Sequence, residues 1–144
     1  MRFFAEELVP FVEERYSTRQ DPQYRILAGD SLGGSVSLHI ALAYPHLFTQ
    51  VLSLSGAFYG VSQHIISEQA DLSWLNIYMI VGLQENAYET DRGIFDFVAL
   101  NRNAKALLEH KQATISYEEK DGKHQWGFWQ KELDQALSYF IEIE

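Results

Sequence analysis

The sequence predicts an α/β protein with a mostly parallel sheet of about four strands and helices on both faces. Short apolar segments typical of buried strands alternate along the chain with longer segments of helical periodicity. The segment "NIYMIVG", which starts at Asn76, is almost wholly apolar, as expected of a strand covered by helices on both sides. No repeat, low-complexity tract or change of composition divides the 144 residues, so one domain over residues 1–144 is expected.

The first predicted helix covers residues 3–15, and a turn and a strand follow it. Its apolar face, with glutamates opposite, consists of Phe4, Leu8, Phe11 and Val12. Pro10 should kink or limit this helix, because proline has no backbone N–H to donate. Asp21-Pro22 is typical of a turn, and the short apolar segment at residues 24–28 then predicts a strand.

The rest of the chain alternates between predicted helices and strands. A helix of small and apolar residues starts at Gly34 and stops before Pro45. The further elements, in order, are a strand over residues 50–55, a strand over 76–82, a helix over 96–110, a strand over 113–120 and a helix over 126–143. The stretch between residues 56 and 75 is less regular, and no element is predicted there.

The composition excludes several classes of partner. Acidic residues outnumber basic ones by 20 to 11, and the net charge of -9 argues against nucleic acid and anionic membrane surfaces. The chain has no cysteine, which excludes disulfides and thiolate metal sites, and we expect neither a metal nor an organic cofactor. No apolar run approaches the roughly 20 residues of a spanning helix, and the acidic start is unlike a secretory signal. A soluble cytoplasmic protein is therefore expected.

A serine between glycines lies where the strand at residues 24–28 meets the next helix. Gly29-x-Ser31-x-Gly33 is the pattern of a nucleophile elbow, in which the serine occupies a strained strand-to-helix turn. A side chain in place of Gly29 or Gly33 is expected to clash, and Gly34 should let the helix lie close to the sheet. The Ser31 oxygen would then lie over a helix N-terminus, whose N–H groups stabilise developing negative charge.

A nucleophilic serine needs a base, and the base needs an orienting carboxylate. Of the five histidines, His124 lies in a loop after the last predicted strand, whereas the other four lie in or near helices or in the irregular stretch. Glu85 follows the strand that ends at Gly82 by three residues, and Asp91 is the alternative acid. The order Ser31, Glu85, His124 puts each side chain at the carboxyl end of a strand, where α/β sheets bind ligands.

A second hydrolase signature overlaps the first. Gly29-Asp30-Ser31-Leu32 spells the GDSL pattern of an unrelated class, and Asp121 and His124 have that class's Asp-x-x-His spacing. That class opens with its serine block on the first strand and carries a Gly-x-Asn-Asp block midway. Here a helix precedes the strand and no such block occurs, so a GDSL-type hydrolase is the lesser alternative.

Several segments together resemble the esterase family of α/β-hydrolases that includes esterase D, enterochelin esterases and feruloyl esterase domains. They are "EELVPFVEERY", "DPQYRILAGDSLGG", "ALAYPHLFTQVLSLSGAF", "IYMIVGLQEN" and "DGKHQWGFWQKEL". The last is similar to the family's Gly-Gly-His-Asp-Trp-x-x-Trp ending, from which Lys123 and Gln125 depart. At helical spacing, Trp126 and Trp129 are expected to anchor the core rather than to line an acyl or alcohol pocket.

The resemblance implies Ser31 as nucleophile, Glu85 as acid, His124 as base and the backbone N–H of Leu32 as one oxyanion donor. It covers nearly the whole chain, yet the family's earlier strands have no counterpart, so the chain corresponds to the C-terminal part of an α/β-hydrolase fold. The loop that gives family members a second oxyanion donor is missing too, and losing one donor costs about 10²–10³-fold in turnover. The strand at residues 24–28 would then expose an apolar edge, through which a homo-oligomer is one hypothesis.

Two functions from different classes follow. The first is a serine carboxylesterase that hydrolyses small carboxylic esters through a Ser-His-Glu triad and an acyl-enzyme. The second is a catalytically incomplete hydrolase fragment that acts as an interaction or dimerisation module, because the second oxyanion donor has no counterpart in the chain.

Overall fold

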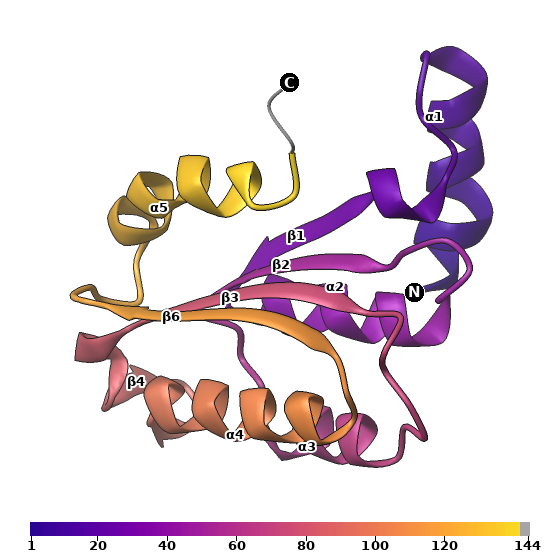
Figure 1. Cartoon of the computed structure of the whole chain (residues 1–144). Coiled ribbons are helices and arrows are strands. Elements are labelled where there is room, and N and C mark those ends of the chain that lie inside the picture. The colour runs from indigo at the N-terminus through magenta and orange to yellow at the C-terminus, as the bar shows by residue number, and fades with distance from the viewer. Residues whose placement is uncertain (142–144) are drawn as a thin grey trace.

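The computed structural model describes residues 1–141, which form a four-stranded parallel sheet with helices on both faces (Figure 1). The strands are β1 (Ile26–Asp30), β2 (Gln50–Leu54), β3 (Asn76–Gly82) and β6 (Thr114–Lys120), in the order β1-β2-β3-β6. Each strand pairs in parallel with its neighbour, so all four carboxyl ends meet at one edge of the sheet. The predicted fold class is confirmed.

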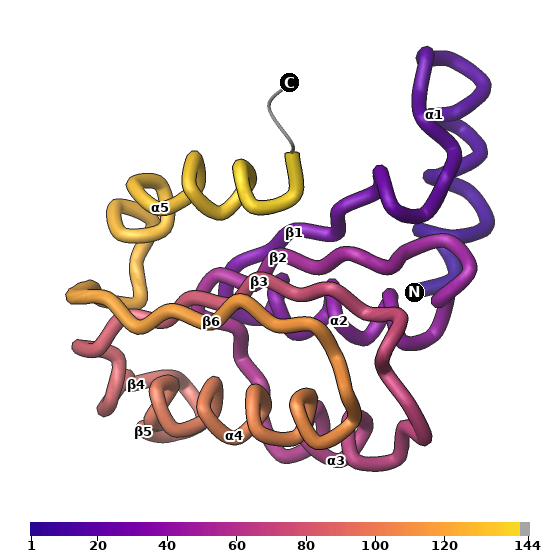
Figure 2. Tube along the Cα trace, viewed as in Figure 1, coloured from indigo at the N-terminus to yellow at the C-terminus, as the bar shows by residue number. Residues whose placement is uncertain are grey.

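Helices cover the two faces unequally. One face carries α2 (Leu32–Ala43), α3 (Gly60–Ser67) and α4 (Phe97–His110), and the other carries α5 (Trp126–Ser138), as Figures 1 and 2 show. Within residues 1–141, no helix combines the length and the apolar character that crossing a membrane requires.

Side chains of the strands alternate between two cores, as the two-residue period of a strand requires. On β3, Ile77 and Met79 belong to the cluster under α2 and α4, whereas Tyr78 and Ile80 belong to the cluster under α5. Both clusters exclude water almost completely, because all four of these side chains are at most 1% exposed. The sheet is thus a rigid base for groups attached to its carboxyl edge.

One short helix and two short strands were not predicted. The irregular stretch contains α3, and residues after β3 form an antiparallel hairpin of β4 (Tyr88–Thr90) and β5 (Gly93–Phe95). Three-residue strands and an eight-residue helix are too short to produce a clear period in the sequence.

Several predicted boundaries were wrong. β1 ends at Asp30 rather than at residue 28, and α2 begins at Leu32 rather than at Gly34. β1 begins two residues later than expected, because Tyr24 belongs to the 3₁₀ turn η2 (Pro22–Tyr24), in which the Asp21 side chain accepts a hydrogen bond from the Gln23 N–H. The last helix ends at Ser138 rather than at residue 143, and residues 142 and 143 of that prediction lie outside the described part of the chain.

The N-terminal helix changes type beside the expected proline. A π-helical turn, η1 (Phe4–Leu8), leads without a break into α1 (Val9–Arg15), of which Pro10 is the second residue. Phe4 and Val9 pack against the core below α2. Phe11 was wrongly placed on the apolar face, because its ring is 50% exposed and lies 3.8 Å from the Arg15 guanidinium carbon.

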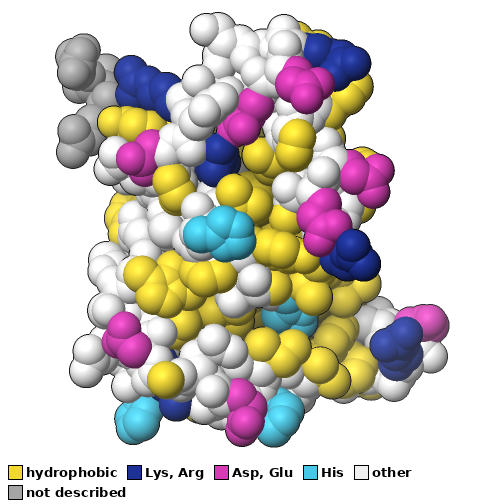
Figure 3. Space-filling model, turned by 90° about the vertical axis from the view of Figure 1, so that its right-hand side faces the viewer, with side chains coloured by type: hydrophobic (Ala, Val, Ile, Leu, Met, Phe, Trp, Pro, Cys, Tyr) yellow, Lys and Arg dark blue, Asp and Glu magenta, His cyan; other side chains and the backbone are white. Residues whose placement is uncertain are grey.

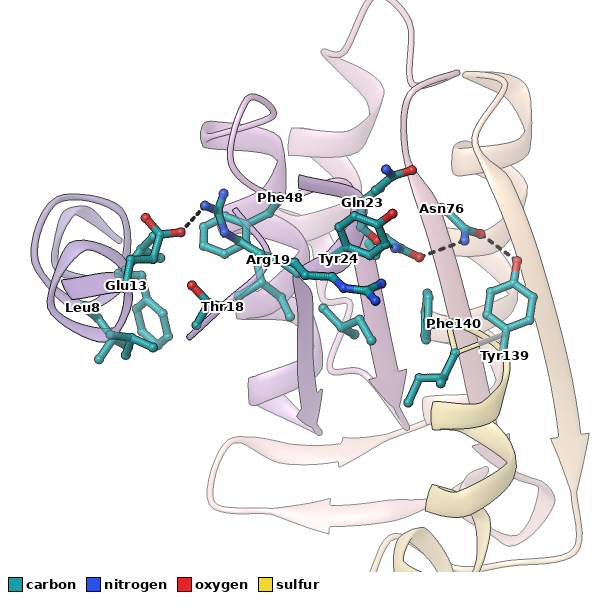
Figure 4. Close-up of a pocket in the computed structure, with 18 residues that line it drawn as sticks. Leu8, Glu13, Thr18, Arg19, Gln23, Tyr24, Phe48, Asn76, Tyr139 and Phe140 are labelled. Atoms are coloured by element: carbon teal, nitrogen blue, oxygen red, sulfur yellow. Dashed lines mark hydrogen bonds and ion pairs between the residues drawn. The ribbon is translucent and has the colours of Figure 1, made fainter. Parts of the chain in front are cut away.

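A groove of about 1170 Å³ separates α1 from the end of α5 and follows the N-terminal part of β1 (Figure 4). On the α1 side of the groove, the Arg25 guanidinium forms an ion pair with Glu13. On the α5 side, the Tyr139 hydroxyl donates a hydrogen bond to the Asn76 side chain. β1 is the edge strand and has no partner on its outer side among the described residues. Seen from the side on which α1 lies in Figure 1, hydrophobic side chains gather across the middle of the surface (Figure 3).

Candidate active site

Ser31 alone forms the turn between β1 and α2. β1 ends at Asp30, α2 begins at Leu32, and Ser31 has φ 50° and ψ −119°, a conformation that non-glycine residues rarely adopt. Two hydrogen bonds hold it there: the Ser31 N–H donates to the Leu54 carbonyl at 2.9 Å, and its carbonyl accepts from the Ala57 N–H at 2.8 Å. The strained backbone therefore presents the Ser31 hydroxyl at the carboxyl edge of the sheet.

Close backbone approach explains two of the glycines beside Ser31. A Cβ atom at Gly29 would lie 2.3 Å from the carbonyl carbon of Gly33, and one at Gly34 would lie 2.6 Å from the Ser53 hydroxyl oxygen. A Cβ atom at Gly33 would meet nothing within 4 Å, so the predicted clash there was wrong. The absent side chain of Gly29 thus lets the strand approach the Gly33 backbone, and that of Gly34 leaves room for Ser53 on β2.

His124 lies between β6 and α5, and its ring joins the two other predicted site residues. Its Nε2 is 2.9 Å from the Ser31 hydroxyl oxygen, and its Nδ1 is 2.6 Å from a Glu85 carboxylate oxygen. The His124 side chain is only 5% exposed, and three aromatic rings surround it. The ring centroids of Tyr88 and Phe97 lie 4.3 Å from that of the imidazole, and the ring of Trp129 lies edge-on at 4.9 Å.

Glu85 is a fully buried carboxylate with a donor for each of its oxygens. It ends the 3₁₀ turn η3 (Leu83–Glu85), which follows β3 directly. One oxygen, Oε1, accepts from the Gly82 N–H at 2.8 Å and from the Ser55 hydroxyl at 2.6 Å, while Oε2 faces His124. A buried carboxylate is stable only when such donors replace its hydration, and here three donors do so.

The two alternative acids lie elsewhere. Asp91 is exposed in the turn between β4 and β5. Asp121 accepts a hydrogen bond from the Gln84 side chain, whereas Nδ1 of His124 is paired with Glu85. The Asp-x-x-His pair that the GDSL interpretation requires does not form.

The remaining histidines lie outside this cluster. His39 on α2 lies 3.0 Å from the Ser62 hydroxyl oxygen on α3, so it joins two helices. Burial lowers the pKa of His39, because a low-dielectric surrounding disfavours the protonated ring.

The two tryptophans of the final helix have different environments. Trp129 is buried, as expected of a core anchor, and its indole N–H donates to the Ser55 hydroxyl at 2.8 Å. Trp126 was wrongly expected in the core, because its side chain is 57% exposed.

The N-terminus of α2 offers a donor for an oxyanion. Leu32 is the first residue of α2, and N–H groups in the first turn of a helix have no acceptor within that helix.

Among residues 1–141, no three His, Cys, Asp or Glu side chains are grouped so that they could hold a metal ion.

Ser55 and Tyr88 contact the cluster but were not singled out from the sequence. A signal for Ser55 was present, since it directly follows β2 at the same edge of the sheet as Ser31, Glu85 and His124. Tyr88 gave no signal, because it belongs to a hairpin too short to be recognised.

Comparison with solved structures shows that this chain is similar in fold to esterases with an α/β fold. The enterochelin esterase from Shigella flexneri superposes with a TM-score of 0.82 at 24% identity, over 94% of this chain and 35% of that one. A ferulic acid esterase superposes with a TM-score of 0.79 at 19% identity, over 96% of this chain and 59% of that one.

The sequence comparison then defines the family. Residues 1–140 match the family described as "Putative esterase", and the chain belongs to this esterase family. The uncharacterized protein YjcH of Bacillus subtilis (strain 168) is 40% identical over 97% of this chain, which spans 59% of that protein. The chain thus covers about three fifths of YjcH and of the ferulic acid esterase.

Proposed function

We propose that the chain carries the catalytic centre of a serine carboxylesterase. The observation on which the proposal rests is the position of the His124 ring, with one nitrogen 2.9 Å from the Ser31 hydroxyl oxygen and the other 2.6 Å from the Glu85 carboxylate. In this arrangement Ser31 is the nucleophile, His124 the general base and Glu85 the carboxylate that orients the base. Membership of the esterase family supports this assignment.

The first half-reaction forms an acyl-enzyme. The Ser31 hydroxyl oxygen attacks the carbonyl carbon of the ester while its proton moves to Nε2 of His124. The Glu85 carboxylate accepts the Nδ1–H, which fixes the tautomer in which Nε2 is free to take that proton. The negative charge on the former carbonyl oxygen is stabilised by the Leu32 N–H. Collapse of this intermediate breaks the ester C–O bond, and the alcohol leaves with the proton from Nε2.

The second half-reaction releases the acid. Water gives a proton to Nε2 of His124 and attacks the acyl carbon. The tetrahedral intermediate then expels the Ser31 oxygen, which regains its proton from Nε2. No step uses a metal or an organic cofactor.

Small carboxylic esters are the proposed substrates. Exposed apolar side chains adjoin two of the site residues in the chain, since Leu32 follows Ser31 and Trp126 lies two residues after His124, and they are 61% and 57% exposed. Apolar surface of this kind favours the hydrocarbon part of an acyl or alcohol group over a charged one.

A fluorophosphonate probe tests the proposal directly, because it reacts covalently with an activated serine. The chain should be labelled, and Ser31→Ala should not be labelled. Ser35→Ala is the matched control, because Ser35 lies on the same helix start and its hydroxyl donates to the Leu32 carbonyl at 3.0 Å. Absence of labelling in the folded parent chain would refute the esterase proposal.

The groove and the outer side of β1, which has no partner strand among residues 1–141, favour a second function, an interaction module derived from an incomplete hydrolase. Such an edge is a template for another strand, and a second copy of the chain is the proposed partner. This function requires no reactive serine, so a folded parent chain that self-associates without labelling would support it.

We also propose that the protein is cytoplasmic. Fractionation of cells that produce it would test this location.

A further inference from the structure

The fully buried Glu85 has one neighbour that the esterase mechanism leaves without a role. The Ser55 hydroxyl donates to Oε1 of Glu85 at 2.6 Å, the shortest of the contacts to that oxygen, and Ser55 itself is 0% exposed. Hydrogen bonds to a buried charged group are strong, because the local dielectric constant is low. The orientation of the carboxylate therefore depends on what fixes the Ser55 hydroxyl.

Ser55 occupies a strained backbone position. It follows the end of β2, its φ is 48°, and its N–H donates to the Ile80 carbonyl at 2.7 Å. Glycine would adopt this conformation without strain. The chain nevertheless has serine at position 55 and its glycine one position later, at Gly56. Strain at a non-glycine residue persists where the side chain is useful. The hydroxyl group is what serine adds over glycine here.

Trp129 fixes the direction of that hydroxyl. Its indole N–H, which can only donate, points at the Ser55 hydroxyl oxygen at 2.8 Å. Because a lone pair of the oxygen is used by Trp129, the single hydroxyl proton is directed to Glu85. The Trp129 ring also lies edge-on to the His124 ring, with centroids 4.9 Å apart and an interplanar angle of 87°.

We infer that Ser55 and Trp129 are positioning residues of the proposed esterase, acting on His124 through Glu85. The Trp129 N–H orients the Ser55 hydroxyl, and the hydroxyl fixes Oε1 so that Oε2 faces Nδ1 of His124. The His124 ring then keeps Nε2 directed at the Ser31 hydroxyl. This inference rests on the proposed function, because it assigns the two residues a role in the same reaction.

Rates of fluorophosphonate labelling test the inference with Ser55→Gly, which removes the hydroxyl and relieves the strain. We expect the maximal labelling rate to fall about 10–100-fold, because a hydrogen bond to a charged group is lost. The probe concentration at half-maximal rate should change less than about twofold, since no contact with the probe is removed. Ser53→Ala is the control: Ser53 is also fully buried on β2, and its hydroxyl has no hydrogen-bond partner among the described residues.

Trp129→Phe separates positioning from packing. In the parent chain we expect it to lower the maximal labelling rate about 3–10-fold, and in the Ser55→Gly background it should lower the rate no further, because the two residues act in series. Loss of packing alone would cost the same factor in both backgrounds, and that result would overturn the role of Trp129. A parental labelling rate in folded Ser55→Gly would overturn the role of Ser55. Failure of the folded parent chain to be labelled would overturn both the inference and the proposed function.

Discussion

Glu85 and His124 are 39 residues apart in the chain, and their side chains are 2.6 Å apart in the structure. Glu85 follows β3 and His124 follows β6, and these two strands are neighbours paired in parallel from Asn76 and Thr114 to their carboxyl ends. The register of that pairing brings Gly82 opposite Lys120, so the turns after the two strands start at the same level. The contact between Glu85 and His124 is thus a consequence of strand order and register.

Replacing the acid tests which carboxylate orients His124. Glu85→Gln keeps the size of the side chain but places an amide opposite Nδ1, and we expect kcat for p-nitrophenyl acetate to fall about 10⁴-fold. Asp91→Asn should change kcat by less than about twofold, because Asp91 is exposed in the hairpin turn. A larger loss with Asp91→Asn than with Glu85→Gln would contradict the assignment of the acid.

The two outer glycines of the serine motif should respond oppositely to alanine. Gly29→Ala forces a methyl group to within 2.3 Å of the Gly33 carbonyl carbon, so we expect a loss of about 3 kcal/mol or more in the free energy of unfolding. Gly33→Ala adds a methyl group on α2 that has nothing within 4 Å apart from the backbone of its own helix, and it should stabilise the fold by about 0.5–1 kcal/mol. Urea unfolding measures the free energy of unfolding of both variants. An equal loss of stability in the two would argue against this packing of β1 on α2.

Tyr78 should limit stability at high pH. Its side chain is 1% exposed, and burial, assisted by the charge of Glu118, raises the pKa of Tyr78 to about 12 from 10.0. Between pH 10 and 12 the unfolded chain therefore loses a proton that the folded chain keeps, so the free energy of unfolding falls as the pH rises. Tyr78→Phe should remove this part of the pH dependence, as followed by urea unfolding at pH 9 to 12.

The same substitution should also raise stability at neutral pH. The Tyr78 hydroxyl lies near the Glu118 carboxylate but makes no well-formed hydrogen bond within residues 1–141, so its removal should raise the free energy of unfolding by about 1 kcal/mol. Tyr139→Phe is the comparison, because the Tyr139 hydroxyl donates to Asn76 at 2.6 Å and its loss should be destabilising. Destabilisation by Tyr78→Phe would show that its hydroxyl is paired.

The chain should self-associate through β1, whose outer side has no partner strand in the described part of the chain. We expect light scattering after gel filtration to detect a species of twice the 16.6 kDa chain mass at high concentration. Ala28→Lys should shift the distribution to monomer, because Ala28 is exposed on β1 and a charged side chain there opposes strand pairing. A parent chain that stays monomeric at millimolar concentration would exclude pairing through β1.

The sequence was informative where long segments have a strong period. The limits of β3 were predicted to the residue, because "NIYMIVG" is apolar throughout and ends at a glycine. The expectation that Ser31, Glu85 and His124 lie close together followed from strand order, since each comes after a strand in one parallel sheet.

What the sequence could not reveal depends on contacts between distant segments. The burial of Trp129 and the exposure of Trp126 depend on how α5 meets the sheet, which helical spacing alone does not define. The role of Ser55 required the position of Trp129, 74 residues away, and its positive φ. The open space at Gly33 likewise depends on the angle between β1 and α2, since Gly29 and Gly33 occupy equivalent places in the motif.

The β4–β5 hairpin contacts the site through Tyr88 but contributes no strand to the main sheet. Its tip, around Asp91 and Gly93, is exposed, so residues can be added or removed there without disturbing the buried network behind the imidazole. Lengthening or shortening this hairpin would alter the surface beside His124 while the Ser31, His124 and Glu85 side chains stay fixed. For the proposed esterase, selection for new substrates would therefore act most readily on the length and tip sequence of this hairpin.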